Sequence, residues 1–305
     1  MSCSGISVRQ PQAVAASCQD CALTAAAPVA AAGQSEDQAA GGKLKMLCLH
    51  GFLQNGNILR MRIGSMRKGL KSRVHFQFHD APFHAASTLT EQQVAAMGGG
   101  ADGLTWFLWS DLGADKRPSL ALKYSNWDAT YASLCDALRQ QQPDGLFGFS
   151  QGATAAALFL AALQTAQRQG KDLDVRLPKF CVVCAGFLPR DPEYAALLEA
   201  AKVDVPTLFV MGTSDALIPP ARSHALMDTF DQRTADMFEH PGAHMVPTCT
   251  GEFKQQMVAF LDRFGSSAPG SVSVGSSLDS LGNTTAAAGA EQQQGEVAAA
   301  VGKCK

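Results

Sequence analysis

Three polar residues of this chain have the types and the spacing needed for nucleophilic attack on a carbonyl group. Ser150 lies in the sequence GFSQGA, Asp215 lies in GTSDALIP and His244 lies in HPGAHMVP. A serine hydroxyl attacks efficiently only when a base such as histidine removes its proton, and that base needs a third group to orient it. We therefore predict that Ser150 is the nucleophile, His244 the base and Asp215 the acid that holds the base.

The glycines on either side of Ser150 give this prediction a mechanical basis. The pattern G-x-S-x-G places the serine on a sharp turn between a strand and a helix, with its hydroxyl exposed above a sheet. The apolar run GLFGF precedes Ser150, and an alanine-rich helical pattern follows it. The alternative interpretation is a tight turn whose serine only caps a helix.

Other residues compete for the two partner roles. Asp191 follows a predicted strand and stays open as the acid, whereas Asp204 precedes its strand and lies at the wrong end. His240 ends a predicted strand and is the second choice for the base, and His224 lies inside a helical pattern. Open α/β sheets bind ligands beyond the carboxyl ends of their strands, so loop residues that follow strands are preferred.

Acyl transfer also needs N–H groups that bind the negative oxygen of the tetrahedral intermediate. One predicted donor is the backbone N–H of Gln151, directly after the nucleophile. The other is the backbone N–H of Phe52, in the loop LHGFLQNGN that follows the first predicted strand. His50 is expected to form a hydrogen bond within this loop and to shape it, without a catalytic role.

A long segment before residue 128 is rich in aromatic side chains. Trp106, Phe107 and Trp109 lie in LTWFLWSD and are candidates for the lining of a substrate pocket. Pockets for acyl or alkyl groups are mostly apolar and aromatic. The alternative is a separate cluster of core residues beneath a long loop.

Short apolar runs and helical patterns alternate along the middle of the chain. The predicted strands are residues 45–50, 74–79, 145–149, 180–187, 206–212 and 235–240, and the clearest predicted helices are residues 128–142, 152–169 and 251–264. Continuous apolar runs are typical of strands covered on both faces. The pattern predicts an α/β fold with a doubly wound, mostly parallel sheet and helices on both faces.

The two ends of the chain differ in composition from its middle. Residues 1–42 and 266–305 are rich in Ala, Gly, Ser and Gln, and they are expected to be disordered because they cannot bury enough apolar surface. Residues 43–265 are expected to form one domain. The N-terminal segment is also a weak candidate for an organelle transit peptide.

Charge, hydropathy and cysteine content exclude several classes of function. The formal net charge is −2, without a long run of one sign, so no nucleic-acid partner is expected. No apolar run approaches the length of a membrane span. The nine cysteines do not form a disulfide scaffold, and the pair Cys181/Cys184 lies in a predicted strand that would turn the two sulfurs to opposite faces. We expect neither a metal nor a cofactor.

Several motifs together resemble those of the FSH-type serine hydrolases. KMLCLHGFLQNG, HDAPF, TWF, GFSQGA, GTSDALIP and HPGAHMVP follow one another over about residues 44–264. The resemblance implies an α/β-hydrolase fold, hydrolysis of carboxylic esters without a cofactor, and the roles given above for Ser150, Asp215 and His244. The chain has GAH where such proteins commonly have GGH, so Ala243 must avoid a positive φ.

These observations predict a serine carboxylesterase for small-molecule esters with hydrophobic acyl or alkyl groups. A thioesterase or lysophospholipase would use the same chemistry, and a receptor with this fold could keep the three residues without turnover. No protein partner is implied. The expected location is the cytoplasm, with an organelle as the alternative if residues 1–42 are a targeting segment.

Overall fold

The computed structural model of the chain describes residues 42–85, 89–96, 100, 102–109 and 118–265. The predicted terminal segments therefore lie outside the described residues, except for residue 42. Nearly the whole predicted domain falls within them.

Six of the apolar runs form one sheet, as predicted. Neighbouring strands pair in parallel throughout, in the order β10-β9-β8-β7-β1-β2. Their bounds are β1 (Leu44–Leu49), β2 (Val74–His79), β7 (Gly145–Phe149), β8 (Phe180–Cys184), β9 (Thr207–Gly212) and β10 (Ala235–His240). The three central strands β7, β8 and β9 are buried at every residue, which explains their unbroken apolar sequence.

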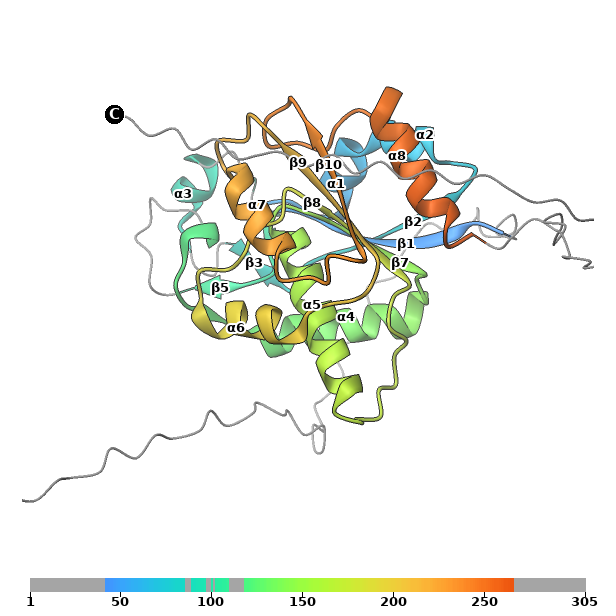
Figure 1. Cartoon of the computed structure of the whole chain (residues 1–305). Coiled ribbons are helices and arrows are strands. Elements are labelled where there is room, and N and C mark those ends of the chain that lie inside the picture. The colour runs from blue at the N-terminus through green and yellow to red at the C-terminus, as the bar shows by residue number, and fades with distance from the viewer. Residues whose placement is uncertain (1–41, 86–88, 97–99, 101, 110–117, 266–305) are drawn as a thin grey trace, which may run out of the picture. The chain divides into compact units, whose positions relative to one another are not determined.

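Helices cover both faces of this sheet (Figure 1). One face carries α1 (Gly56–Arg62), α2 (Gly64–Gly69) and α8 (Gly251–Asp262), and the other carries α4 (Trp127–Gln141), α5 (Gln151–Arg168), α6 (Pro192–Ala201) and α7 (Pro220–Met227). Two apolar clusters fill the spaces between the sheet and these layers. Cys181 belongs to one cluster and Cys184 to the other, so the two buried thiols face opposite sides of β8, as their spacing predicts.

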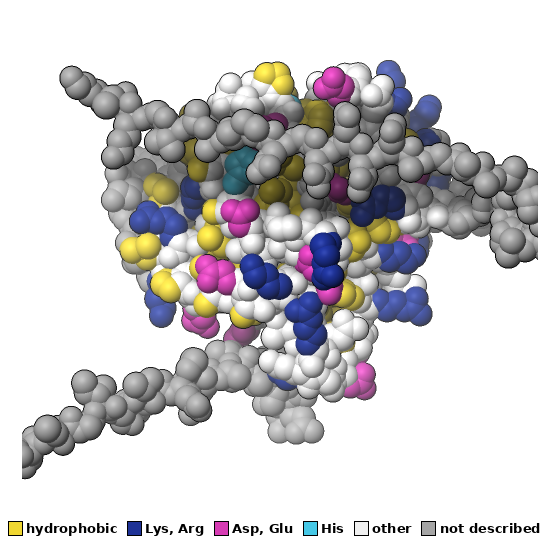
Figure 2. Space-filling model, in the orientation of Figure 1, with side chains coloured by type: hydrophobic (Ala, Val, Ile, Leu, Met, Phe, Trp, Pro, Cys, Tyr) yellow, Lys and Arg dark blue, Asp and Glu magenta, His cyan; other side chains and the backbone are white. Residues whose placement is uncertain are grey.

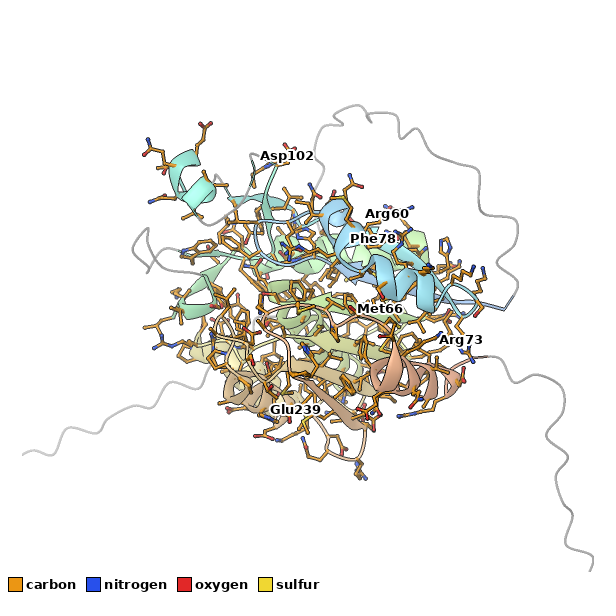
Figure 3. All side chains as sticks on the ribbon, turned by 90° about the horizontal axis from the view of Figure 1, so that it is seen from above. Arg60, Met66, Arg73, Phe78, Asp102 and Glu239 are labelled. Atoms are coloured by element: carbon orange, nitrogen blue, oxygen red, sulfur yellow. The ribbon has the colours of Figure 1, made fainter. Side chains whose placement is uncertain are left out.

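The α1 side of the sheet also carries a contact that is visible from above (Figure 3). The guanidinium of Arg60 lies 5.9 Å from the ring centroid of Phe78, so α1 contacts β2 through a cation and an aromatic face. Arg73, just before β2, donates to Asp262 at the end of α8 over 2.8 Å. Both contacts tie the edge strand β2 to helices on this face.

The strand order reverses between β1 and β7, and this reversal determines where a site forms. From β1 the chain first adds β2 on one side, and then adds β7, β8, β9 and β10 on the other side. Leu49 pairs with Gly148 in the sheet, so the loops after β1 and β7 leave the same edge side by side. Such a switch point leaves a crevice at the carboxyl ends of the strands.

The segment between β2 and α4 forms small elements of its own. These are β3 (Phe83–His84), α3 (Glu91–Ala96), β4 (Leu104–Thr105), β5 (Leu108–Trp109), the 3-10 turn η3 (Pro118–Leu120) and β6 (Tyr124–Ser125). The antiparallel pairs β3–β4 and β5–β6 lie within the segment, and a bridge between Gln54 and Leu104 joins the segment to the loop after β1. None of these elements was predicted, because two-residue strands, a three-residue turn and a six-residue helix are too short to leave a clear periodicity in a sequence.

Candidate active site

Ser150 lies on the turn that its glycines predict. Its backbone has φ 55° and ψ −119°, between the end of β7 and the first residue of α5. A residue with a side chain adopts such a positive φ only when its surroundings impose it. A Cβ on Gly148 would lie 2.4 Å from the Ala153 Cα, and a Cβ on Gly152 would lie 2.4 Å from the carbonyl oxygens of Leu49 and His50. Both glycines are therefore required by close approach of backbone.

We expect Gly152→Ala to destabilise the domain by at least about 3 kcal/mol, because the new methyl group meets fixed backbone rather than a movable side chain. The measurement is the free energy of unfolding in urea. Gly64→Ala is the matched control, since a Cβ there has no neighbour within 4 Å. Equal stability of the two variants would contradict this account of the turn.

The structure brings the three predicted side chains together. His244 Nε2 lies 2.9 Å from Ser150 Oγ, and His244 Nδ1 lies 2.7 Å from Asp215 Oδ2. The Asp215 side chain is almost fully enclosed, at 1 % exposure, while His244 is partly open at 16 %. With Asp215 ionised, Nδ1 carries the proton that it donates, so Nε2 is left to accept from the Ser150 hydroxyl.

Backbone hydrogen bonds hold the two partner loops in place. The second carboxylate oxygen of Asp215 accepts from the N–H groups of Leu217 and Ile218, at 2.9 and 2.8 Å. The loop that carries His244 is tied to the loop that carries Asp215, because the Ser214 N–H donates to the Gly242 carbonyl. Ala243 is not among the residues with positive φ, so the departure from GGH causes no strain there.

The two predicted oxyanion donors border the same cleft as Ser150 and His244. Gln151 begins α5, where backbone N–H groups have no partner within the helix. In the loop after β1, the N–H groups of Gly51, Leu53 and Gln54 all donate to other groups. No acceptor for the Phe52 N–H occurs among the described residues.

His50 forms a hydrogen bond to the Gly51–Phe52 peptide group, which carries the Phe52 N–H. Its Nε2 accepts from the Ala81 N–H at 3.0 Å, so Nδ1 carries the proton and donates to the Gly51 carbonyl at 2.8 Å. In a trans peptide the carbonyl and the following N–H point in opposite directions. A bond to the Gly51 carbonyl therefore orients the Phe52 N–H. Burial lowers the pKa of His50 to about 4, which keeps this ring neutral.

We expect His50→Ala to lower kcat up to about 10²-fold with little change in KM, as for a misplaced oxyanion donor. The measurement is steady-state hydrolysis of a p-nitrophenyl ester. His50→Asn, whose amide can donate to the same carbonyl, should recover part of the loss. A rise in KM with unchanged kcat would instead indicate a role in substrate binding.

The aromatic residues Trp106, Phe107 and Trp109 are buried beneath the residues of this site. Trp106 and Phe107 are fully buried, and Trp109 is 6 % exposed. The Trp106 indole N–H donates to the His50 carbonyl at 2.8 Å, and its backbone N–H donates to the Gln151 side chain at 3.0 Å. Trp109 meets the Phe52 ring edge to face at 5.5 Å. The three residues predicted as pocket lining do not border the cleft, and their contacts favour the core alternative.

Other residues form the wall of the cleft next to Ser150. The cleft has a volume of about 40 Å³ and is lined by Phe52, Ser119, Ser150, Gln151, Phe187, Leu217, Ile218 and His244. Sequence reasoning missed Phe187 because it extended the strand to residue 187. The strand ends at Cys184, and Ala185 turns the chain with φ 51°. Leu217 and Ile218 follow a strand end, a signal that could have identified them.

The alternative acids and bases have other partners. Asp204 pairs with Arg168 on the surface, and Asp191 accepts from the backbone N–H groups of Tyr124 and Glu193. His224 pairs with Glu239, and His240 accepts from a backbone N–H within its own loop. None of these contacts joins Ser150.

Charged side chains of both signs lie on the described surface outside the cleft. Asp and Glu side chains lie scattered among Lys and Arg side chains on the face shown in Figure 2. Across the described ranges, no three His, Cys, Asp or Glu residues are placed to hold a metal ion. None of the helices in these ranges is long and apolar enough to cross a membrane.

Known proteins are similar to this chain in sequence. Esterase OVCA2 of Danio rerio is 33 % identical over 234 residues, which are 72 % of this chain and 97 % of that protein. A Schizosaccharomyces pombe protein named dihydrofolate reductase is 32 % identical over 213 residues, which are 67 % of this chain and 44 % of that protein. The chain thus spans less than half the length of the second relative.

Solved structures support the fold. Arabidopsis thaliana SOBER1 aligns with a TM-score of 0.50 and 18 % identity, over 72 % of this chain and 98 % of that one. The architecture is an α/β-hydrolase fold, as predicted. The family model described as "Serine hydrolase (FSH1)" matches residues 40–257, which is well over half of the sequence. The chain belongs to the FSH1 serine hydrolase family.

Proposed function

We propose that the protein is a serine carboxylesterase whose nucleophile, base and acid are Ser150, His244 and Asp215. The observation that carries the proposal is the continuous chain of hydrogen bonds from Asp215 through His244 to the Ser150 hydroxyl, at 2.7 and 2.9 Å, opening into an apolar cleft. Membership of a serine hydrolase family and the esterase name of the zebrafish relative support it.

The geometry supports a two-step reaction. His244 Nε2 takes the Ser150 proton as the oxygen attacks the ester carbonyl, and the Phe52 and Gln151 N–H groups bind the developing oxyanion. The imidazolium then protonates the departing alcohol, which leaves an acyl group on Ser150. A water molecule, deprotonated by His244, attacks this acyl group and releases the acid.

The lining of the cleft favours apolar substituents on the ester. Phe52, Phe187, Leu217 and Ile218 supply an apolar wall, and Leu217 is 40 % exposed at its rim. We therefore propose esters of hydrophobic acyl or alkyl groups as the substrate class.

Covalent labelling followed by turnover tests the proposal. The folded protein is treated with a fluorophosphonate, and peptide mass spectrometry locates the adduct. We expect it on Ser150. Hydrolysis of p-nitrophenyl acetate, butyrate, octanoate and palmitate, beside thioesters of the same acids, then gives kcat/KM for each chain length and bond type.

Each outcome has a distinct meaning. Multiple turnovers with oxoesters preferred would support a carboxylesterase, and thioesters preferred would replace it by a thioesterase. Labelling without multiple turnovers would favour a ligand receptor. Absence of an adduct on Ser150 in well-folded protein would overturn the proposed mechanism.

We also propose the cytoplasm as the place of action. The location of the tagged full-length chain, compared with that of a chain beginning at residue 43, tests this proposal. A shift to the cytoplasm only after truncation would assign residues 1–42 as a targeting segment.

A further inference from the structure

Arg222 lies directly behind the wall of the cleft. It belongs to the first turn of α7, and its guanidinium lies 4.8 Å from the ring centroid of Phe187, which lines the cleft. One terminal nitrogen, Nη2, donates to the carbonyl of Ser119 at 2.6 Å and to that of Leu188 at 3.2 Å. Ser119 also lines the cleft. The positive charge thus contacts two of the wall residues.

The other terminal nitrogen of Arg222 has no partner. Nη1 is buried and donates to no atom of the structure. Within the described residues, no carboxylate forms an ion pair with Arg222. Partial burial lowers the pKa of Arg222, as does the nearby cation Arg190, while Tyr124 acts in the opposite direction. Carbonyl groups satisfy some of its N–H donors but do not neutralise its charge.

A partly buried charge without a counter-ion is costly to fold, and a ligand that supplies the opposite charge would offset that cost. Arg73, Arg139 and Arg168 each pair with a carboxylate, and all three lie on the surface, where water also solvates their charge. Arg222 differs from them, because it is only partly exposed, lies next to the cleft and forms no ion pair with a carboxylate of the described residues. A planar guanidinium with a free terminal nitrogen suits a carboxylate or a phosphate.

We propose that Arg222 selects esters that carry an anionic group at the end of the acyl or alkyl chain remote from the scissile bond. This inference rests on the proposed esterase function. The hydrophobic stem of such a substrate lies between Phe187, Leu217 and Ile218, and its anion reaches the guanidinium between Phe187 and Ser119. The anion then competes with the Ser119 carbonyl for Nη2, and it accepts from Nη1 by displacing the groups that cover this nitrogen.

The test compares pairs of esters that differ only at the remote end. The p-nitrophenyl monoesters of adipic and suberic acid are set beside p-nitrophenyl hexanoate and octanoate, and a phosphonate-terminated ester of the same length distinguishes the two anions. We expect wild type to prefer one anionic series over the neutral esters by about ten- to a hundredfold in kcat/KM, as for a hydrogen bond to a charged group.

Three variants assign the preference to one side chain. Arg222→Gln should lower the anionic-to-neutral ratio by about tenfold or more, and Arg222→Lys, which keeps the charge, should retain part of it. Arg190→Gln is the matched control, because Arg190 is exposed and donates to the neighbouring carbonyl of Leu120. Its ratio should stay close to that of wild type.

The outcomes separate this inference from the proposed function. Ser150-dependent turnover of neutral esters with no preference for either anion would overturn the role of Arg222 and leave the esterase function intact. The same holds if Arg222→Gln and Arg190→Gln change the ratio equally. No turnover of any ester would instead overturn the proposed function.

Discussion

Replacing Ser150 with alanine is expected to lower kcat for ester hydrolysis by about 10⁵- to 10⁶-fold, and His244→Ala is expected to have an effect of similar size. The two residues act as one unit, because the hydroxyl attacks only as the imidazole removes its proton over the 2.9 Å that separates them. The double variant should therefore be no slower than either single variant. Stopped assays with high enzyme concentration measure the residual rates.

The controls for this prediction use residues away from the cleft. His224→Ala removes a surface histidine whose partner is Glu239, and it should leave kcat near that of wild type. Circular dichroism of each variant excludes unfolding as the cause. If the losses of the two single variants multiplied in the double variant, Ser150 and His244 would act independently. The proposed proton transfer from Ser150 to His244 would then be wrong.

The sheet could be predicted because its strands are buried on both faces. The runs at 145–149 and 207–212 are apolar at almost every position, and the structure buries all of their residues. The segment between β2 and α4 could not be predicted in the same way. Its two-residue strands are held by long-range contacts, such as the hydrogen bond from the Thr130 hydroxyl to the Trp106 carbonyl at 2.6 Å.

In the candidate site, the three proposed catalytic residues could be predicted from the sequence, but the lining of the cleft could not. Ser150, Asp215 and His244 each follow a strand end, so topology alone placed them at one edge of the sheet, and the structure sets them within hydrogen-bond distance. The wall of the cleft depends on how separate loops meet. Aromatic character suggested Trp106 as lining, but its indole N–H is used by the His50 carbonyl. Sequence shows the type of a side chain and leaves open which way it faces.

Asp215→Asn is expected to lower kcat at neutral pH by about 10⁴-fold while leaving the fold intact, as when a triad carboxylate becomes an amide. The surroundings of Asp215 dictate how the amide must lie. The N–H groups of Leu217 and Ile218 donate to Oδ1, so the single oxygen of asparagine has to occupy that position. The amide NH₂ then faces His244 and donates to Nδ1.

This orientation reverses the tautomer of His244. With Nδ1 accepting, the ring proton moves to Nε2, which then donates to Ser150 Oγ and can no longer take its proton. Asp191→Asn is the matched control, because Asp191 is also a buried carboxylate that accepts from two backbone N–H groups, and the folded variant should keep its kcat. Nitrogen-15 NMR of the His244 ring would report the tautomer directly. Near-normal activity with protonated Nε2 would show that the ring tautomer does not control the reaction.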